Sequence, residues 1–198
     1  MPAEPGPRLA AARERLLEAA CALFSARGVR DVGVDELVAS ASVAKATFYK
    51  YFPSKDDLVL AVLDQHAFGW VRAMRERAAD ASPADRAEVL FDLLADATAQ
   101  VWDPVLDPSV LVRVALELGP KDPAGARCLE HLDAAHDLLA DLAQAAGVAH
   151  PVQLADTWRL LLLGALTATL HGDAGAGERA RVLGAGLVTR PIAARFAG

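Results

Sequence analysis

Helix-start and helix-stop signals divide the chain into short segments, and this pattern limits the fold more than any other feature of the sequence. A proline follows a serine or an aspartate at residues 83, 108 and 123, where it suits the first turn of a helix. Glycines that suit a left-handed helix end stand at four places: Gly28, Gly119, Gly147 and Gly172. The residues between these signals are apolar at helical spacing, and strand-like alternation is nearly absent. The sequence therefore predicts an all-α fold.

The same signals predict about nine helices and two domains. We expect the helices at residues 8–27, 34–40, 44–52, 54–77, 82–102, 107–118, 122–146, 151–171 and 177–190. The first domain, residues 10–70, is expected to hold three helices with a helix-turn-helix over 33–52, followed by a connecting helix. The second domain, residues 71–198, is expected to be a larger helical body.

The composition is that of a globular protein with a buried core, since 54% of the 198 residues are hydrophobic and 23% are charged. The longest dense apolar run, residues 160–170, is too short to span a bilayer. The first residues lack the apolar segment of a secretory signal, so we expect a cytoplasmic protein without membrane contact. Cys21 and Cys128 fit no zinc spacing and are expected to be reduced thiols. His131 and His136 are five residues apart, on different sides of a helix, so we expect no metal site.

The charge distribution singles out one short segment. Residues 1–60 hold eight Lys/Arg and eight Asp/Glu, and the remainder, with 12 basic and 18 acidic residues, accounts for the net charge of −6. Within the neutral part, residues 41–55 contain three lysines, two tyrosines and two phenylalanines but no carboxylate. A protein with this balance would not bind nucleic acid through its body, so any DNA contact must come from this segment.

The segment fits the second helix of a helix-turn-helix. Helical spacing turns Val43, Phe48 and Phe52 toward the first helix. The residues left facing outward are Lys45, Ala46, Thr47, Tyr49 and Lys50. Small and basic residues at the start of such a helix can approach base edges in the major groove, and lysines and tyrosines suit phosphate oxygens. A solvated helix surface without a DNA partner is the other interpretation of the same spacing.

A family resemblance supports DNA binding. Residues 13–63, with Ala19, Ala20, Leu23, Phe24 and Gly28 in the first helix and "ATFYKYFPSKDDL" later, resemble the N-terminal domain of the TetR family of transcriptional repressors. The resemblance implies that the start of the recognition helix reads bases and that other residues hold the sugar-phosphate backbone. The first set is Lys45, Ala46 and Thr47, and the second is Tyr49, Tyr51 and Lys55.

The segment also departs from the family pattern at four positions. Gly33 replaces the hydroxyl residue that usually caps the second helix, and Ala44 and Tyr51 replace the usual serine and histidine. Ser42 replaces a turn glycine, so a left-handed backbone there would carry some strain. These differences bear on the sequence of the operator, the DNA site of a regulator.

The resemblance also implies a homodimer formed by the last two helices. Independently, "TWRLLLLGALTATL" is apolar nearly all round, and a monomer would bury only one face of such a helix, unless the helix is enclosed in the core. Small residues there and in "ARVLGAGLV" permit close helix approach. The expected interface residues are Leu162, Gly164, Ala165, Ala168 and Gly184.

The family further implies a small-molecule effector that binds the body, although no specific residues carry over. Arg113 and Glu117 are the only charged residues of "VLVRVALEL" and are one turn apart, so they could bind a polar ligand group or form an ordinary ion pair. Three tryptophans could line the pocket or belong to the core: Trp70, Trp102 and Trp158. No cofactor is expected.

The sequence as a whole predicts a DNA-binding transcriptional regulator. We expect a homodimer on a pseudo-palindromic operator, acting as a repressor that a ligand releases. We do not expect an enzyme, because we find no nucleophile elbow, glycine-rich phosphate loop, HExxH motif or carboxylate cluster with a histidine. The alternative is a helical adaptor that uses the positive segment to bind another protein.

Overall fold

The protein is described by a computed structural model over residues 7–82, 86–99 and 108–189. Within these ranges it is built from nine α-helices and has no strand. The helices are α1 (Pro7–Arg27), α2 (Val34–Ser40), α3 (Lys45–Tyr51), α4 (Lys55–Asp80), α5 (Arg86–Ala99), α6 (Ser109–Leu118), α7 (Pro123–Ala145), α8 (Pro151–Leu170) and α9 (Ala176–Thr189). The all-α prediction is confirmed.

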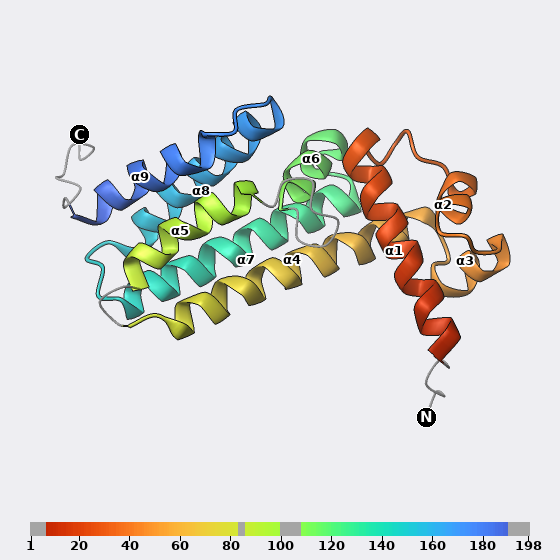
Figure 1. Ribbon diagram of the computed structural model, residues 1–198, viewed down its shortest axis with the longest axis horizontal. Coiled ribbons are helices and arrows are strands. Elements are labelled where there is room, and N and C mark those ends of the chain that lie inside the picture. Colours follow the sequence, from red (N-terminus) through yellow and green to blue (C-terminus); the bar gives the residue numbers. More distant parts are fainter. Residues whose placement is uncertain (1–6, 83–85, 100–107, 190–198) are drawn as a thin grey trace.

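The molecule is elongated, with a small head at one end and a helical body at the other (Figure 1). The head contains α1, α2 and α3. Helix α4 starts in the head and runs along the body beside α7, while α5 and α8 also pack against α7 and α9 lies against α5 and α8. Helix α6 lies where the body meets α1. No helix among the described residues is long and apolar enough to cross a membrane.

Local sequence explains where the head helices begin and end. Ser54 forms a capping box with Asp57: the serine side chain accepts a hydrogen bond from the Asp57 N–H, and the Asp57 carboxylate accepts one from the Ser54 N–H. At the end of α2, Ser42 has φ +52°, and the N–H groups of Ser42 and Val43 donate to Ala39 O and Val38 O. The left-handed turn expected at Ser42 is therefore present in a Schellman motif.

Two apolar cores meet along α4. The head core contains Leu16 and Phe48 and includes α4 as far as Ala67. The body core begins on α4 at Trp70, whose ring stacks on that of Trp158 at a centroid distance of 5.9 Å. The head core also contains buried residues from α6 and from the start of α7: Val110, Leu111, Val114, Ala124 and Cys128. The body is thus packed directly against the base of the head.

Two glycines let α9 lie against α5. A Cβ atom at Gly177 would overlap the Thr98 hydroxyl, and one at Gly184 would overlap the ring of Phe91, which is fully buried. The close approach that the sequence suggested for Gly184 therefore exists. It occurs inside the protomer and not at its surface.

Several helix ends differ from the sequence prediction. Helix α4 ends at Asp80, three residues later than expected, because no proline or glycine stands between Arg77 and residue 83. Helix α6 begins at Ser109 and has Pro108 at its N-cap position. The helix expected over 82–102 is described only as α5, and Trp102 lies outside the described residues.

Candidate DNA-binding surface and its coupling to the body

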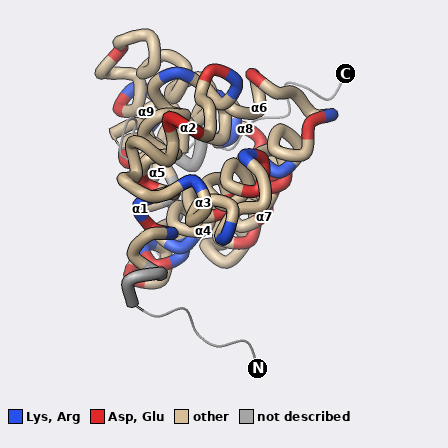
Figure 2. Tube along the Cα trace, turned by 90° about the vertical axis from the view of Figure 1, so that its right-hand side faces the viewer, with Lys and Arg blue, Asp and Glu red and all other residues tan. Residues whose placement is uncertain are grey.

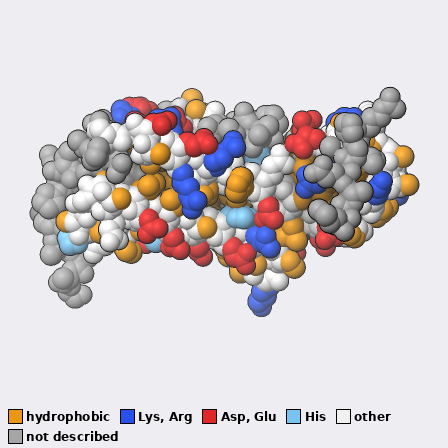
Figure 3. All heavy atoms as spheres, turned by 90° about the horizontal axis from the view of Figure 1, so that it is seen from below, with side chains coloured by type: hydrophobic (Ala, Val, Ile, Leu, Met, Phe, Trp, Pro, Cys, Tyr) orange, Lys and Arg blue, Asp and Glu red, His pale blue; other side chains and the backbone are white. Residues whose placement is uncertain are grey.

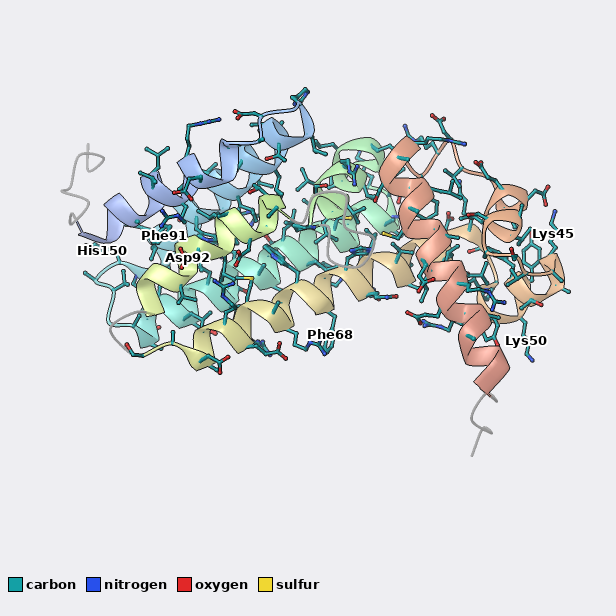
Figure 4. All side chains as sticks on the ribbon, viewed as in Figure 1. Lys45, Lys50, Phe68, Phe91, Asp92 and His150 are labelled. Carbon is teal, nitrogen blue, oxygen red and sulfur yellow. The ribbon has the colours of Figure 1, made fainter. Side chains whose placement is uncertain are left out.

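The outer surface of α3 forms the end of the head. Phe48 and Phe52 are buried at 0% and 4% exposure, and Val43 packs against the same core, as predicted. This anchoring leaves Lys45 and Lys50 exposed and pointing away from the body (Figure 4). Seen from the head end, α3 lies in front of the other helices, with basic positions along it (Figure 2).

The side chains between the two lysines complete this surface. Ala44 and Ala46 are exposed and small, and Thr47 is half-buried. Tyr49 is 49% exposed, and its ring meets that of Phe48 edge-on at 5.1 Å, which fixes its orientation. The surface therefore presents two lysine ammonium groups, a tyrosine phenol and a threonine hydroxyl around small alanine side chains. These groups can bind base edges and phosphates.

Lys45 is held by α2. Its Nζ donates a hydrogen bond of 2.6 Å to Oδ1 of Asp35, and this bond raises the pKa of Lys45 above its ordinary value, so the ammonium is charged at neutral pH. The Asp35 side chain is 83% exposed. To bind a base, Lys45 must break its hydrogen bond with Asp35. The unpaired Asp35 carboxylate is then close enough to the DNA-facing surface to repel a phosphate.

Tyr51 and Lys55 do not belong to the exposed surface, although the family resemblance assigned them to the DNA backbone. The Tyr51 hydroxyl is buried and has no hydrogen-bond partner among the described residues. Nζ of Lys55 donates to the carbonyl oxygens of Val29 and Val32 at 2.9 and 3.1 Å. Lys55 therefore stabilises the loop between α1 and α2.

Further contacts, which the sequence did not suggest, position the recognition helix. Nε of Arg15 on α1 donates to the carbonyl of Ala41 at the turn between α2 and α3. Arg27 donates to both carboxylate oxygens of Glu36 on α2, at 2.6 and 2.9 Å. Both arginines come from α1, so α1 fixes the helix-turn-helix at two points.

Helix α6 contacts the C-terminal end of α1 and the residues that follow it. The Glu117 carboxylate accepts hydrogen bonds from the N–H groups of Val29 and Arg30, at 2.9 and 2.7 Å, and Nη1 of Arg113 donates to Ser25 O at 2.6 Å. Gly28 has φ +85°, and a Cβ atom there would crowd the Glu117 carboxylate. Arg113 and Glu117, which the sequence suggested for a ligand pocket, instead join the body to the backbone of the head.

Known proteins share both the sequence of the head and the overall fold. The model of "Bacterial regulatory proteins, tetR family" matches residues 16–62. The structure of SCO4454, a TetR-family transcriptional regulator from Streptomyces coelicolor, is similar with a TM-score of 0.79 and 29% identity, over 91% of this chain and 95% of that one. These matches support a TetR-family regulator. The relatives are named as regulators, and the family is non-enzymatic.

Curated TetR-family relatives match mainly at the head. The transcriptional activator FasR of Mycolicibacterium smegmatis is 41% identical over 64 residues, which is 32% of this chain and 29% of FasR. The repressor NemR of Escherichia coli K12 is 36% identical over 64 residues, which is 32% of each chain. The chain therefore matches less than a third of the length of either relative.

The last two helices expose an apolar face. Leu160 on α8 is 72% exposed, and Val182 and Leu183 on α9 are 56% and 62% exposed. Gly164 and Ala168 lie on this face and line a shallow groove of about 230 Å³ with Leu160 and Leu183. Ala165 is buried but also lines this groove, whereas two other predicted interface residues, Leu162 and Gly184, are buried inside the protomer.

A groove lies on the underside of α4, between the head and the body. It has a volume of about 770 Å³ and lies between Arg13 and Glu14 of α1, α4, and Arg127, His131 and Ala134 of α7. Phe68 is 72% exposed and points from α4 into solvent (Figure 4). Figure 3 shows this face, where apolar side chains alternate with charged ones. Trp70 and Trp158, proposed from sequence for a pocket, are stacked in the core.

Charged groups in the groove are largely paired with one another. Nη1 of Arg127 donates to both oxygens of Asp64, at 2.9 and 3.1 Å, and Nε2 of His131 lies 2.8 Å from Oδ1 of the same carboxylate. Among the residues that the structure describes, no group of three or more histidines, cysteines or carboxylates is arranged to hold a metal ion.

Proposed function

We propose that this chain is a sequence-specific transcriptional repressor that binds a pseudo-palindromic operator as a homodimer and is released by a small molecule. The observation that supports DNA binding best is the exposed surface of α3, where Lys45, Tyr49 and Lys50 surround small residues while Phe48 and Phe52 fix the helix from behind. A helix held rigidly from one side and polar on the other is suited to the major groove.

The homodimer is proposed from the exposed apolar face of α8 and α9. One recognition helix contacts only a few base pairs, so a specific site needs a second copy about one turn of DNA away. Exposed leucines beside a glycine on two adjacent helices are unusual for a monomer surface and suit close packing of helices against a second copy. In this arrangement the two heads point away from the interface.

The effector is proposed to act through the joint between head and body. The groove under α4 is within the size range of small-molecule sites, and its walls come from α1 in the head and α7 in the body. A largely apolar molecule with one polar group would contact both and would favour one head position. Such a population shift requires only a few kcal/mol of preference for the released state.

DNA binding can be tested by selecting duplexes from a random pool with the purified protein. The variant for comparison carries Lys45→Ala and Tyr49→Phe, and the matched control is Lys121→Ala, which removes an exposed lysine outside the helix-turn-helix. We expect the wild type and the control to enrich the same pseudo-palindrome and the double variant to lose it. No enrichment by a folded dimer would refute DNA reading and favour the helical adaptor.

The regulatory sign needs a separate measurement, because the named relatives include an activator and a repressor. Transcription in vitro from a promoter that carries the selected operator should fall when the protein is added. It should recover when an effector found by operator release is added. Stimulation by the protein alone would contradict the repressor assignment and leave DNA binding intact.

A further inference from the structure

A cysteine and a histidine are in contact inside the head, away from the DNA-binding surface. Sγ of Cys21 on α1 lies 2.9 Å from Nε2 of His66 on α4. Both residues are buried, at 2% and 3% exposure, and 45 residues separate them in the sequence. Leu17 of α1 and Val62 of α4 are also buried beside them. A thiol at this distance from an imidazole nitrogen can transfer its proton to the ring, which is how cysteine nucleophiles are activated.

A small cavity leads to this pair. Its volume is about 60 Å³, and Cys21 and His66 form part of its wall together with Glu14, Glu18 and Gln65. Water occupies about 30 Å³ per molecule in the liquid, so the cavity has room for a molecule of about two heavy atoms. Its other titratable groups, Glu14 and Glu18, both belong to α1.

The outer wall of the cavity consists of side chains that can move. Nε2 of Gln65 donates to Oε1 of Glu14 at 3.5 Å, the limit of a hydrogen bond. These two residues line both the small cavity and the large groove under α4. The shared residues place the small cavity next to the groove.

We propose that Cys21 and His66 form an oxidation site for small peroxides, and that oxidation of Cys21 weakens DNA binding by the head. The imidazole of His66 accepts the thiol proton, and the thiolate attacks one peroxide oxygen. The S–O bond forms as the O–O bond breaks, and the leaving hydroxide takes the proton from the imidazolium to become water. Sulfur is oxidised by two electrons to a sulfenic acid, and the peroxide is reduced.

The position of Cys21 on α1 explains how its oxidation would affect the recognition helix. Cys21 is on the same helix as Arg15 and Arg27, which hold the turn before α3 and the side of α2. A sulfenic oxygen would add volume and a hydrogen-bonding group at the contact between α1 and α4, where Leu17 and Val62 are buried beside the sulfur. A shift of α1 relative to α4 would move the helix-turn-helix relative to the body. This second half of the proposal depends on the proposed DNA-binding function.

The second cysteine is an internal control. Cys128 is buried at 0% exposure in the same core, and burial raises the pKa of its thiol to about 12. A thiol with such a pKa is almost entirely protonated at neutral pH and is therefore a poor nucleophile. Comparing the two cysteines within one chain does not depend on any variant folding correctly.

The test exposes the full-length protein to hydrogen peroxide, removes the peroxide with catalase, and unfolds the protein in dimedone followed by a maleimide. Mass spectrometry then gives the oxidised fraction of each cysteine. We expect Cys21 to be oxidised about 100-fold faster than Cys128. Affinity for the selected operator, measured by fluorescence anisotropy, should fall about tenfold with oxidation, because a polar group is introduced into a buried contact. Cys21→Ala should keep its affinity under peroxide.

The role of His66 is tested by the pH dependence of the oxidation rate. In the wild type the rate should change little between pH 6 and 8. In His66→Gln it should rise about tenfold per pH unit, as for an ordinary thiol with a pKa near 8.5. Circular dichroism checks that each variant is folded.

Each failure has a distinct meaning. Equal oxidation of the two cysteines, or oxidation only on unfolding, would overturn the site. Selective oxidation of Cys21 with unchanged operator affinity would overturn its regulatory role. If no operator is found, the proposed function and the regulatory role fail together, while the oxidation rates still decide whether Cys21 and His66 form a reactive pair.

Discussion

Removal of the Glu117 carboxylate should loosen the head from α6 without unfolding either part. The carboxylate accepts hydrogen bonds from the N–H groups of Val29 and Arg30 at 2.9 and 2.7 Å. A hydrogen bond to a charged group contributes about 1.5–3 kcal/mol when well shielded, and these two are partly exposed, so we estimate a joint contribution of about 2 kcal/mol. Glu117→Ala should lower the free energy of local opening by this amount.

Amide hydrogen exchange measures this change directly. In Glu117→Ala the amides of Val29 and Arg30 should exchange about 30-fold faster, the equivalent of about 2 kcal/mol, while those in the core of α4 keep their protection. Leu116→Ala is the matched control, because its side chain is 79% exposed on the neighbouring position of α6. Glu117→Ala should also bind the operator with unchanged affinity but respond less to an effector. Unchanged exchange at Val29 and Arg30 would refute the idea that α6 holds the head through this carboxylate.

Three further predictions concern the DNA-binding surface, the body core and the dimer face. Lys50→Ala should weaken binding to all duplexes alike and reduce the slope of log affinity against log salt by about one, in titrations at several salt concentrations; an unchanged slope would exclude a phosphate contact. Gly184→Ala should lower the free energy of unfolding by about 1–3 kcal/mol and Tm by several degrees in calorimetry, because the new methyl group meets the ring of Phe91. Gly186→Ala has open space around the new methyl group and should leave Tm unchanged, so equal Tm values for the two variants would contradict the packing of α9 on α5. Leu160→Glu should dissociate the dimer in sedimentation equilibrium, and Val152→Glu, which is also exposed but lies in the first turn of α8, should not; a Leu160→Glu dimer would rule out this face.

The parts of the head that depend on neighbouring residues in the sequence could be predicted from it. Phe48 and Phe52 are four residues apart, so they share one face of a helix and are both buried. Ser54 and Asp57 form the predicted helix start, and Ser42 adopts the predicted left-handed turn. In each case the interaction lies within one or two turns of chain, where spacing alone determines which groups meet.

The contacts of long side chains could not be predicted in the same way. Lys55 is of a residue type that commonly binds phosphate, yet its ammonium donates hydrogen bonds to two carbonyl groups of the loop after α1. Arg113 and Glu117 are one turn apart, which fits an ion pair, but their partners lie 87 or 88 residues away in the head. A flexible side chain selects its partner from whatever the tertiary fold brings near, and the sequence of one segment does not contain that information.

The body shows a second limit of sequence reasoning. Helix α8 is apolar nearly all round, so the sequence indicates that more than one face is covered but not which neighbour covers each. In the structure Leu162 faces the protomer core, while Leu160 and Gly164 face outward. Gly184 is required by Phe91 of the same chain. Small residues permit close approach to any helix, so they cannot distinguish an internal contact from a dimer contact.

Helix α1 links every proposed input to the recognition helix. Its end is held by Glu117 of α6, its middle contacts His66 of α4 through Cys21, and its arginines fix the turn before α3. The estimated contribution of the Glu117 contact, about 2 kcal/mol, corresponds to a change of about 30-fold in an equilibrium between two head positions. A ligand in the groove and an oxidised Cys21 would act on the same equilibrium from different sides of α1. If both inputs work in this way, their effects on operator affinity should be less than additive once one of them has already displaced the head.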